Sequence, residues 1–221
     1  MGMIFTKNLI AGYPFEGNVN DVSGAHHGTS SNVGFENGVI GKAATFNGST
    51  SYIELPDADD FSFTDGTNDL PFSISFWVKF NDTSNQWLIN KRDASSNDEW
   101  QIAYYSGELI FNLFSQGGRS AIIGRGLNFT PEIGRYYHMV CTYDGGGSSL
   151  GMQFYIDTVS LGWGQNSGVY IGMEKGTAPI LIGRAVFGSH FNLNGSLDNL
   201  KIYNRALTQQ EVKRDYLNLA I

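Results

Sequence analysis

Short runs in which apolar and polar residues alternate recur along the whole chain, and they constrain the fold more than any other feature. In the clearest run, residues 72–80, one face would carry Phe72, Ile74, Phe76, Val78 and Phe80. This alternation predicts a half-buried β-strand, because successive side chains of a strand point to opposite faces. Clusters of Gly, Asn, Asp and Ser, which are typical of turns, separate the runs. The pattern therefore predicts a sandwich or barrel of antiparallel strands.

The other runs extend this prediction to the ends of the chain. A hairpin is predicted from strands at 100–105 and 108–114, joined by the turn Ser106–Gly107. Further strands are expected at 10–14, 43–46, 52–55, 86–91, 120–123, 136–143, 152–157, 180–182 and 195–203. Residues 160–179 are expected to form an elaborated loop or an extra hairpin. One helix is predicted, since Thr208 and Glu211 form a capping box before an apolar stripe that ends near residue 218.

No repeat and no shift in composition divides the 221 residues, so a single domain, 1–221, is predicted. The net charge of −7 and the lack of a basic cluster argue against nucleic acid as a partner. No apolar run is long enough for a membrane-spanning helix, so membrane insertion is not expected. The lone Cys141 excludes a disulfide framework within the chain and is expected to be a small buried hydrophobe.

The first residues lack the basic and apolar regions of a signal peptide. This feature predicts either an excised module or a protein exported without a cleaved signal, such as part of a phage or viral appendage. An extracellular, cell-surface or virion location is expected in each case.

Several phrases occur in a fixed order: AGYPFEGNVNDVSG at 11–24, GKAATFNG at 41–48, and GSLDNLKIYNRALT at 195–208. Together with 72–79 and 137–145 between them, they resemble the laminin-G-like jelly-roll domains of the concanavalin A-like lectin/glucanase superfamily. The resemblance implies an all-β, two-sheet antiparallel jelly-roll sandwich with one short C-terminal helix. It leaves the function open, because the superfamily holds lectins, enzymes and protein-binding domains.

Two signatures of the superfamily's enzymes are missing from the sequence. Retaining glucanases carry Glu-x-Asp-x-x-Glu on a strand, which supplies paired carboxylates, but no Glu in this chain precedes Asp by two residues. The Gln-x-His strand of alginate lyases is not found either. The acidic pair Asp98–Glu99 is expected to lie in a solvated turn. No catalytic residue is therefore assigned.

A calcium site is predicted near the N-terminus. Glu16, Asn18 and Asp21 cluster in a Gly-containing loop, and their side chains offer the oxygen ligands that Ca²⁺ prefers. The resemblance implies that this loop meets the Asp of the closing strand, here Asp198. Such a structural calcium would clip the two chain ends together. The alternative is that these residues only bond their own turn backbone.

Sugar-binding groups are predicted in the segment that departs most from the family pattern. Trp163, Gln165, Asn166 and Tyr170, with His190 further on, combine aromatic faces with hydrogen-bonding groups, as carbohydrate sites do. Trp77 matches a recurrent family position and is expected to be structural. Three other aromatic residues lie on strands whose outward face the sequence leaves open, namely Trp87, Trp100 and Tyr104.

The leading prediction is a non-catalytic, lectin-like domain that recognises a carbohydrate through loops at one edge of the sandwich. One alternative is a structural or protein–protein interaction domain of a virion or surface assembly, with Trp163 in a subunit contact. The other is a glycoside hydrolase or polysaccharide lyase with a rearranged pair of carboxyl groups in a groove. A homo-oligomer or larger surface assembly is compatible with each of them.

Overall fold

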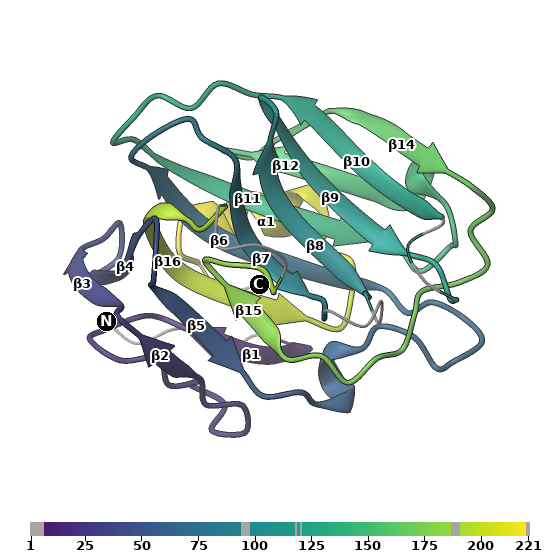
Figure 1. Cartoon of the computed structure of the whole chain (residues 1–221), viewed down its shortest axis with the longest axis horizontal. Coiled ribbons are helices and arrows are strands. Elements are labelled where there is room, and N and C mark those ends of the chain that lie inside the picture. Colours follow the sequence, from purple (N-terminus) through teal and green to yellow (C-terminus); the bar gives the residue numbers. More distant parts are fainter. Residues whose placement is uncertain (1–6, 94–97, 118, 120, 187–190, 220–221) are drawn as a thin grey trace.

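The structure is a computed structural model that describes residues 7–93, 98–117, 119, 121–186 and 191–219. In this part of the chain, two antiparallel eight-stranded sheets form a sandwich (Figure 1). Sheet A contains β1 (Leu9–Tyr13), β3 (Gly34–Asn37), β4 (Lys42–Asn47), β6 (Phe72–Phe80), β11 (Tyr136–Tyr143), β12 (Met152–Ile156), β13 (Val159–Leu161) and β16 (Asn194–Tyr203). Sheet B contains β2 (Thr29–Ser31), β5 (Tyr52–Leu55), β7 (Gln86–Lys91), β8 (Trp100–Tyr105), β9 (Glu108–Phe114), β10 (Ile122–Asn128), β14 (Trp163–Ser167) and β15 (Ile180–Ile182).

The strand order of sheet B positions the candidate site. It runs β14-β10-β9-β8-β7-β15-β5-β2, and Figure 1 shows β14, β10, β9 and β8 side by side. In sheet A the order is β13-β12-β11-β6-β16-β4-β3, and β1 also pairs with β16. The remaining described elements are the short 3-10 helices η1 (Asp59–Phe61) and η2 (Ser149–Gly151) and the helix α1 (Gln209–Tyr216). The predicted all-β sandwich with one short C-terminal helix is confirmed.

Aromatic side chains fill the space between the two sheets. The rings of Phe63 and Phe72 stack with their centroids 3.9 Å apart, and Phe111 meets Phe72 edge-on. Trp100 and Tyr104 of β8 belong to this core, as does the lone Cys141 of β11, so all three are buried as structural residues. Because side chains alternate along each strand, the neighbouring residues of β8 and β9 face outward from sheet B.

Helix α1 covers the outer side of sheet A and is held there by a buried polar cluster. The capping box of Thr208 and Glu211 is present, and the helix ends at Tyr216, two residues before the expected end. Beneath the helix, Asp215 accepts hydrogen bonds from Ser75 and Lys201, and His138 Nε2 lies 3.2 Å from its carboxylate. Burial alone would raise the pKa of Asp215, but His138 and Lys201 hold it well below its usual range. Although Ser, His and Asp meet here, all are buried, so the cluster anchors the helix.

The structure differs from the sequence predictions at three strands, β10, β2 and β3. The strand expected at 120–123 is β10, which runs from Ile122 to Asn128 because it pairs with β9 along its full length; residue 120 lies outside the described residues. Glycines at 124 and 126 hid the alternation. The short strands β2 and β3 were not predicted, because neither carries a clear apolar pattern. No helix in the described part of the chain is long and apolar enough to cross a membrane.

Candidate functional site

The outward face of sheet B carries a cavity of about 500 Å³, here called the outer cavity. It is lined by Trp87 of β7, Gln101 and Tyr105 of β8, Ile110 of β9, and Arg92, Arg119 and Phe191 from connecting segments. Phe191 closes the β7 side, because its carbonyl accepts a hydrogen bond from Trp87 N–H at 2.8 Å. The cavity thus joins aromatic faces to hydrogen-bonding side chains on a rigid sheet.

The aromatic rings of the outer cavity are partly open to solvent. Tyr105 is 43% exposed, and its ring meets that of Phe191 edge-on with centroids 5.9 Å apart. The guanidinium carbon of Arg92 lies 5.3 Å from the ring centroid of Trp87. Aromatic faces of this kind pack against the C–H surfaces of a small ligand, while neighbouring polar groups fix its orientation.

One buried carboxylate positions both arginines of the outer cavity. Asp98 Oδ2 accepts a hydrogen bond from Arg92 Nη2 at 2.8 Å and another from Arg119 Nε. Arg92 also donates to Gln101 within the cavity wall. The expectation that Asp98–Glu99 forms a solvated turn is therefore wrong, since both side chains are fully buried. Their partners come from other segments, so local sequence gave no sign of this burial.

Glu99 forms a second buried ion pair behind the cavity wall. Its Oε1 accepts from Lys91 Nζ at 2.6 Å, from Gly176 N–H at 3.0 Å and from Ser62 Oγ at 3.1 Å. Burial raises the pKa of Glu99 to about 7, against the lowering effect of Lys91. The pair ties β7 to Ser62, directly after η1, and to the segment before β15, and so it supports the site without lining it.

The predicted sugar-binding residues are split between two places. Trp163, Gln165 and Asn166 lie on β14, an edge strand paired with β10, so this part of residues 160–179 is a strand and not the elaborated loop that was one of the two expectations. Trp163 is 42% exposed, and Gln165 Nε2 lies 3.5 Å from Glu108 Oε2. Tyr170 lies beyond the end of the strand, and His190 falls outside the described residues.

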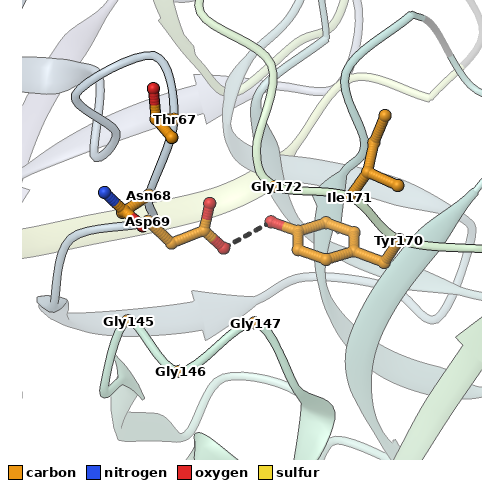
Figure 2. Close-up of a pocket in the computed structure, with 9 residues that line it drawn as sticks. All are labelled: Thr67, Asn68, Asp69, Gly145, Gly146, Gly147, Tyr170, Ile171 and Gly172. Atoms are coloured by element: carbon orange, nitrogen blue, oxygen red, sulfur yellow. Dashed lines mark hydrogen bonds between the residues drawn. The ribbon is translucent and has the colours of Figure 1, made fainter.

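Tyr170 lines a separate polar cavity of about 290 Å³ at one end of the sandwich. Figure 2 shows its hydroxyl directed at the carboxylate of Asp69, to which it donates a hydrogen bond of 2.7 Å. Burial and this carboxylate raise the pKa of Tyr170. Tyr143 also donates to Asp69, as does Met173 N–H. Asp69 therefore connects three chain segments through hydrogen bonds. The hydroxyl group of Tyr170 has one hydrogen to donate, and it is used in this contact.

The four predicted calcium ligands also separate. Asp21 accepts hydrogen bonds from the backbone N–H groups of Gly12, Ser23, Ala25 and His26. Burial alone would raise the pKa of Asp21, but these bonds and the Ser23 hydroxyl hold it below its usual range. Asn18 Oδ1 accepts from Asn20 N–H within its own turn. The Asp21 and Asn18 side chains thus stabilise the loop by accepting hydrogen bonds from its backbone N–H groups.

Glu16 and Asp198, in contrast, meet at the turn between β3 and β4. A Cβ added at Gly41 would collide with the Glu16 carboxylate, and one at Gly38 would touch Asp198 Oδ2. That oxygen accepts from Val39 N–H at 2.8 Å and from Ile40 N–H at 2.9 Å. The other oxygen, Oδ1, is buried without a hydrogen-bond partner. Burial raises the pKa of Asp198 to about 6, and the charge of Glu16 adds to this effect.

Sequence reasoning missed most of the outer cavity. Trp87 was recognised as a candidate, but Tyr105, Ile110 and Gln101 were not. The sequence showed that side chains alternate along the hairpin at 100–114, but it did not show which face of the hairpin points away from the core. Trp100 is buried, so the face that carries Gln101, Ala103 and Tyr105 points outward.

The sandwich with these strand orders is a jelly roll. A comparison with known protein families shows to which of them the chain belongs. The laminin-G-type family model of the concanavalin A-like lectin/glucanases superfamily matches residues 47–213. The chain therefore belongs to this superfamily. No curated protein sequence matches it.

Among solved structures, the chain is similar to the binding domain of Paraclostridial Mosquitocidal Protein 1, at 21% identity and a TM-score of 0.75, covering 95% of this chain and 52% of that one. It is also similar to domain 4 of an extracellular arabinanase from Geobacillus stearothermophilus, solved with arabinotriose, at 21% identity and a TM-score of 0.69, covering 96% and 99%. The receptor binding domain of botulinum neurotoxin D matches at 15% identity and a TM-score of 0.70, covering 95% and 52%. The chain spans about half the length of these toxin domains. At such identities the likeness shows the fold alone.

Proposed function

We propose that the chain is a non-catalytic carbohydrate-binding domain and that the outer cavity is its binding site. The observation that carries this proposal is the combination of three aromatic rings with Gln101 and two fixed guanidinium groups in one open cavity. Its lining residues in the described chain include no carboxylate, so the cavity supplies groups for binding and lacks the acid–base pair of a glycosidase. The arabinanase domain solved with arabinotriose gives further support. We propose an extracellular, cell-surface or virion location for a domain with this function.

A structural calcium ion between Glu16 and Asp198 is a second part of the proposal. Two carboxylates share the turn at 38–41, and the buried Oδ1 of Asp198 lacks a partner, so a cation fits this donor set. Backbone carbonyl oxygens would complete the shell. Bound Ca²⁺ would neutralise the two charges and join the N-terminal loop to β16. Asp21 and Asn18 are left out of this site, because Asp21 already accepts hydrogen bonds on both carboxylate oxygens and Asn18 accepts through Oδ1 within its own turn. Among the described residues, no group of three or more His, Cys, Asp or Glu is placed so that it could hold a metal ion, so the proposed site depends on oxygen ligands from the backbone as well.

A protein-interaction role is the second candidate, and one surface favours it. Five large apolar side chains are exposed on η2, on the edge strand β13 and in the segment after the edge strand β14, namely Leu150, Val159, Leu161, Val169 and Ile171. Exposed apolar surface at a sheet edge is typical of interaction sites. This surface is distinct from the outer cavity, so variants of either can be tested separately.

The test is binding of the purified full chain to a broad glycan and polysaccharide array, in calcium and in chelator. Trp87→Ala and Tyr105→Ala are expected to weaken binding about 10-fold or more, as truncation of a central aromatic contact does. Tyr216→Ala is the matched control, because Tyr216 is a similarly exposed tyrosine on the sheet A side. Equal binding by all variants would place the site elsewhere. If the folded protein binds no glycan, the carbohydrate-binding proposal is wrong.

A further inference from the structure

The strand register of sheet B places amide side chains in a row across five strands. Gln165 pairs with Gly124, Gly124 with Asn112, Asn112 with Gln101, and Gln101 with Asn90. Paired residues of neighbouring strands share a face, so the row lies on the outward side of sheet B. It extends the polar groups of the outer cavity well past Gln101, as far as the edge strand β14.

A second row runs parallel to the first and has a tryptophan at each end. Trp163 pairs with Gly126, Gly126 with Ile110, Ile110 with Ala103, and Ala103 with Trp87. The two rows are two residues apart on each strand of β14, β10, β9 and β8, so they lie next to each other on one face. An amide row and an aromatic row together form what is here called the outer platform.

Because Gly124 and Gly126 of β10 have no side chains, nothing projects from β10 in the middle of the outer platform. A Cβ at Gly126 would collide with the Gln165 side chain, and one at Gly124 would collide with Asn112 Oδ1. These amide side chains therefore lie flat over glycine backbone instead of standing up from the sheet. Between the two tryptophans the aromatic row holds only Gly126, Ile110 and Ala103, so no large polar side chain from that row interrupts the surface.

Three polar side-chain atoms of the outer platform are buried without a hydrogen-bond partner among the described residues. They are the acceptors Oδ1 of Asn90 and Oδ1 of Asn112 and the donor Nε1–H of Trp87. A buried polar group without a partner is destabilising. A ligand rich in hydroxyl groups supplies donors and acceptors together, so it can satisfy groups of both kinds. None of the positions in either row is charged.

The length of the outer platform sets the size of its ligand. Trp163 and Trp87 are separated by four inter-strand steps of about 4.8 Å, or about 19 Å. A single sugar at the outer cavity would leave Trp163 and Gln165 without contact. We propose that the ligand is an extended, uncharged glycan chain that lies across the strands from Trp87 to Trp163. In this proposal, which rests on the proposed carbohydrate-binding function, β14 lengthens the site so that it selects long chains over single sugars.

The experiment compares ligands of increasing length. Affinity electrophoresis of the full chain in soluble arabinan, xylan, mannan and mixed-linkage glucan first identifies a polysaccharide that retards it. Isothermal titration then uses the disaccharide, tetrasaccharide and hexasaccharide from that polymer. For the wild type, affinity is expected to rise at least about 10-fold from the disaccharide to the hexasaccharide. Trp163→Ala is expected to remove most of this gain while leaving disaccharide binding unchanged, and Val169→Ala, at another exposed site near β14, is expected to change neither.

The outcomes separate the two proposals. If no polysaccharide retards the protein and no glycan binds on the array, the proposed carbohydrate-binding function is wrong. The proposed preference for long glycan chains is then wrong as well. If glycans bind but affinity is the same for all three lengths, or Trp163→Ala matches the wild type with the hexasaccharide, only the extended site is overturned. An affinity that falls steeply with added salt would contradict the uncharged ligand. A cooperative unfolding transition of Trp163→Ala, at a midpoint near that of the wild type, establishes that the variant is folded.

Discussion

Asp198 is expected to destabilise the folded protein whenever its carboxyl group is ionised and no cation is bound. Its side chain is buried, and burial together with Glu16 raises its pKa from 3.8 to about 6. A difference of about two pKa units corresponds to about 3 kcal/mol. Because the folded state holds the proton more tightly than the unfolded state, this contribution to stability is present below about pH 4 and is lost as pH rises through about 6.

Replacing Asp198 by Asn removes the charge while keeping the shape of the side chain. The amide oxygen can still accept from Val39 N–H and Ile40 N–H, as Oδ2 does now. In chelator, the variant and the wild type are expected to have similar unfolding free energies near pH 4. Near pH 7 the variant is expected to be more stable by up to about 3 kcal/mol.

Urea unfolding followed by tryptophan fluorescence, at both pH values, measures this difference. In the presence of Ca²⁺ at neutral pH, the wild type should gain stability and Asp198→Asn should gain little. A stability difference that is the same at both pH values would refute the reasoning, because it would show that packing and not charge distinguishes the two side chains. If Ca²⁺ stabilises Asp198→Asn as much as the wild type, the proposed calcium ion does not bind at this carboxylate.

Two further variants test how the scaffold is held together. Asp215→Ala would leave the buried Lys201 and His138 without their anion, so we expect a loss of about 3–5 kcal/mol in urea unfolding; a loss below about 1 kcal/mol would show that the cluster does not anchor α1. Gly162 has φ +92°, and a Cβ there would collide with the carbonyl oxygen of Gly126. Gly162→Ala should therefore cost about 1–3 kcal/mol and selectively increase amide hydrogen exchange in β14, whereas an unchanged exchange pattern would contradict this role.

Local patterns were sufficient where a segment's own residues determine its structure. The strand at 72–80 and the hairpin turn at Ser106–Gly107 follow from alternation and from tolerance of positive φ, which is +53° and +82° at these two residues. The capping box likewise begins α1 where it was predicted. In each case the pattern that predicts the structure lies within a few residues along the chain.

The candidate site depended on contacts between distant segments, and these were beyond local patterns. β14 has no apolar alternation, and it forms a strand because β10 offers it a glycine-lined edge. The buried Asp98 pairs with Arg92 and also with Arg119, which reaches it from another segment. The pairing of Trp87 with Ala103 passes through an irregularity in β7, which no sequence motif marks. Sequence reasoning therefore proposed Trp163 and Gln165 as site residues, but it did not predict the sheet face that they share with Trp87.

The four tryptophans allow the most direct test of the outer cavity as a glycan site. Trp87 and Trp163 lie on the outer platform, whereas Trp100 is in the core and Trp77 packs against Tyr216 on the sheet A side. Indole N–H resonances of the ¹⁵N-labelled protein would be recorded while a glycan that binds on the array is added. We predict saturable shifts of the Trp87 and Trp163 signals, with those of Trp77 and Trp100 unchanged. Saturable binding that leaves the Trp87 signal in place would contradict the assignment of the site.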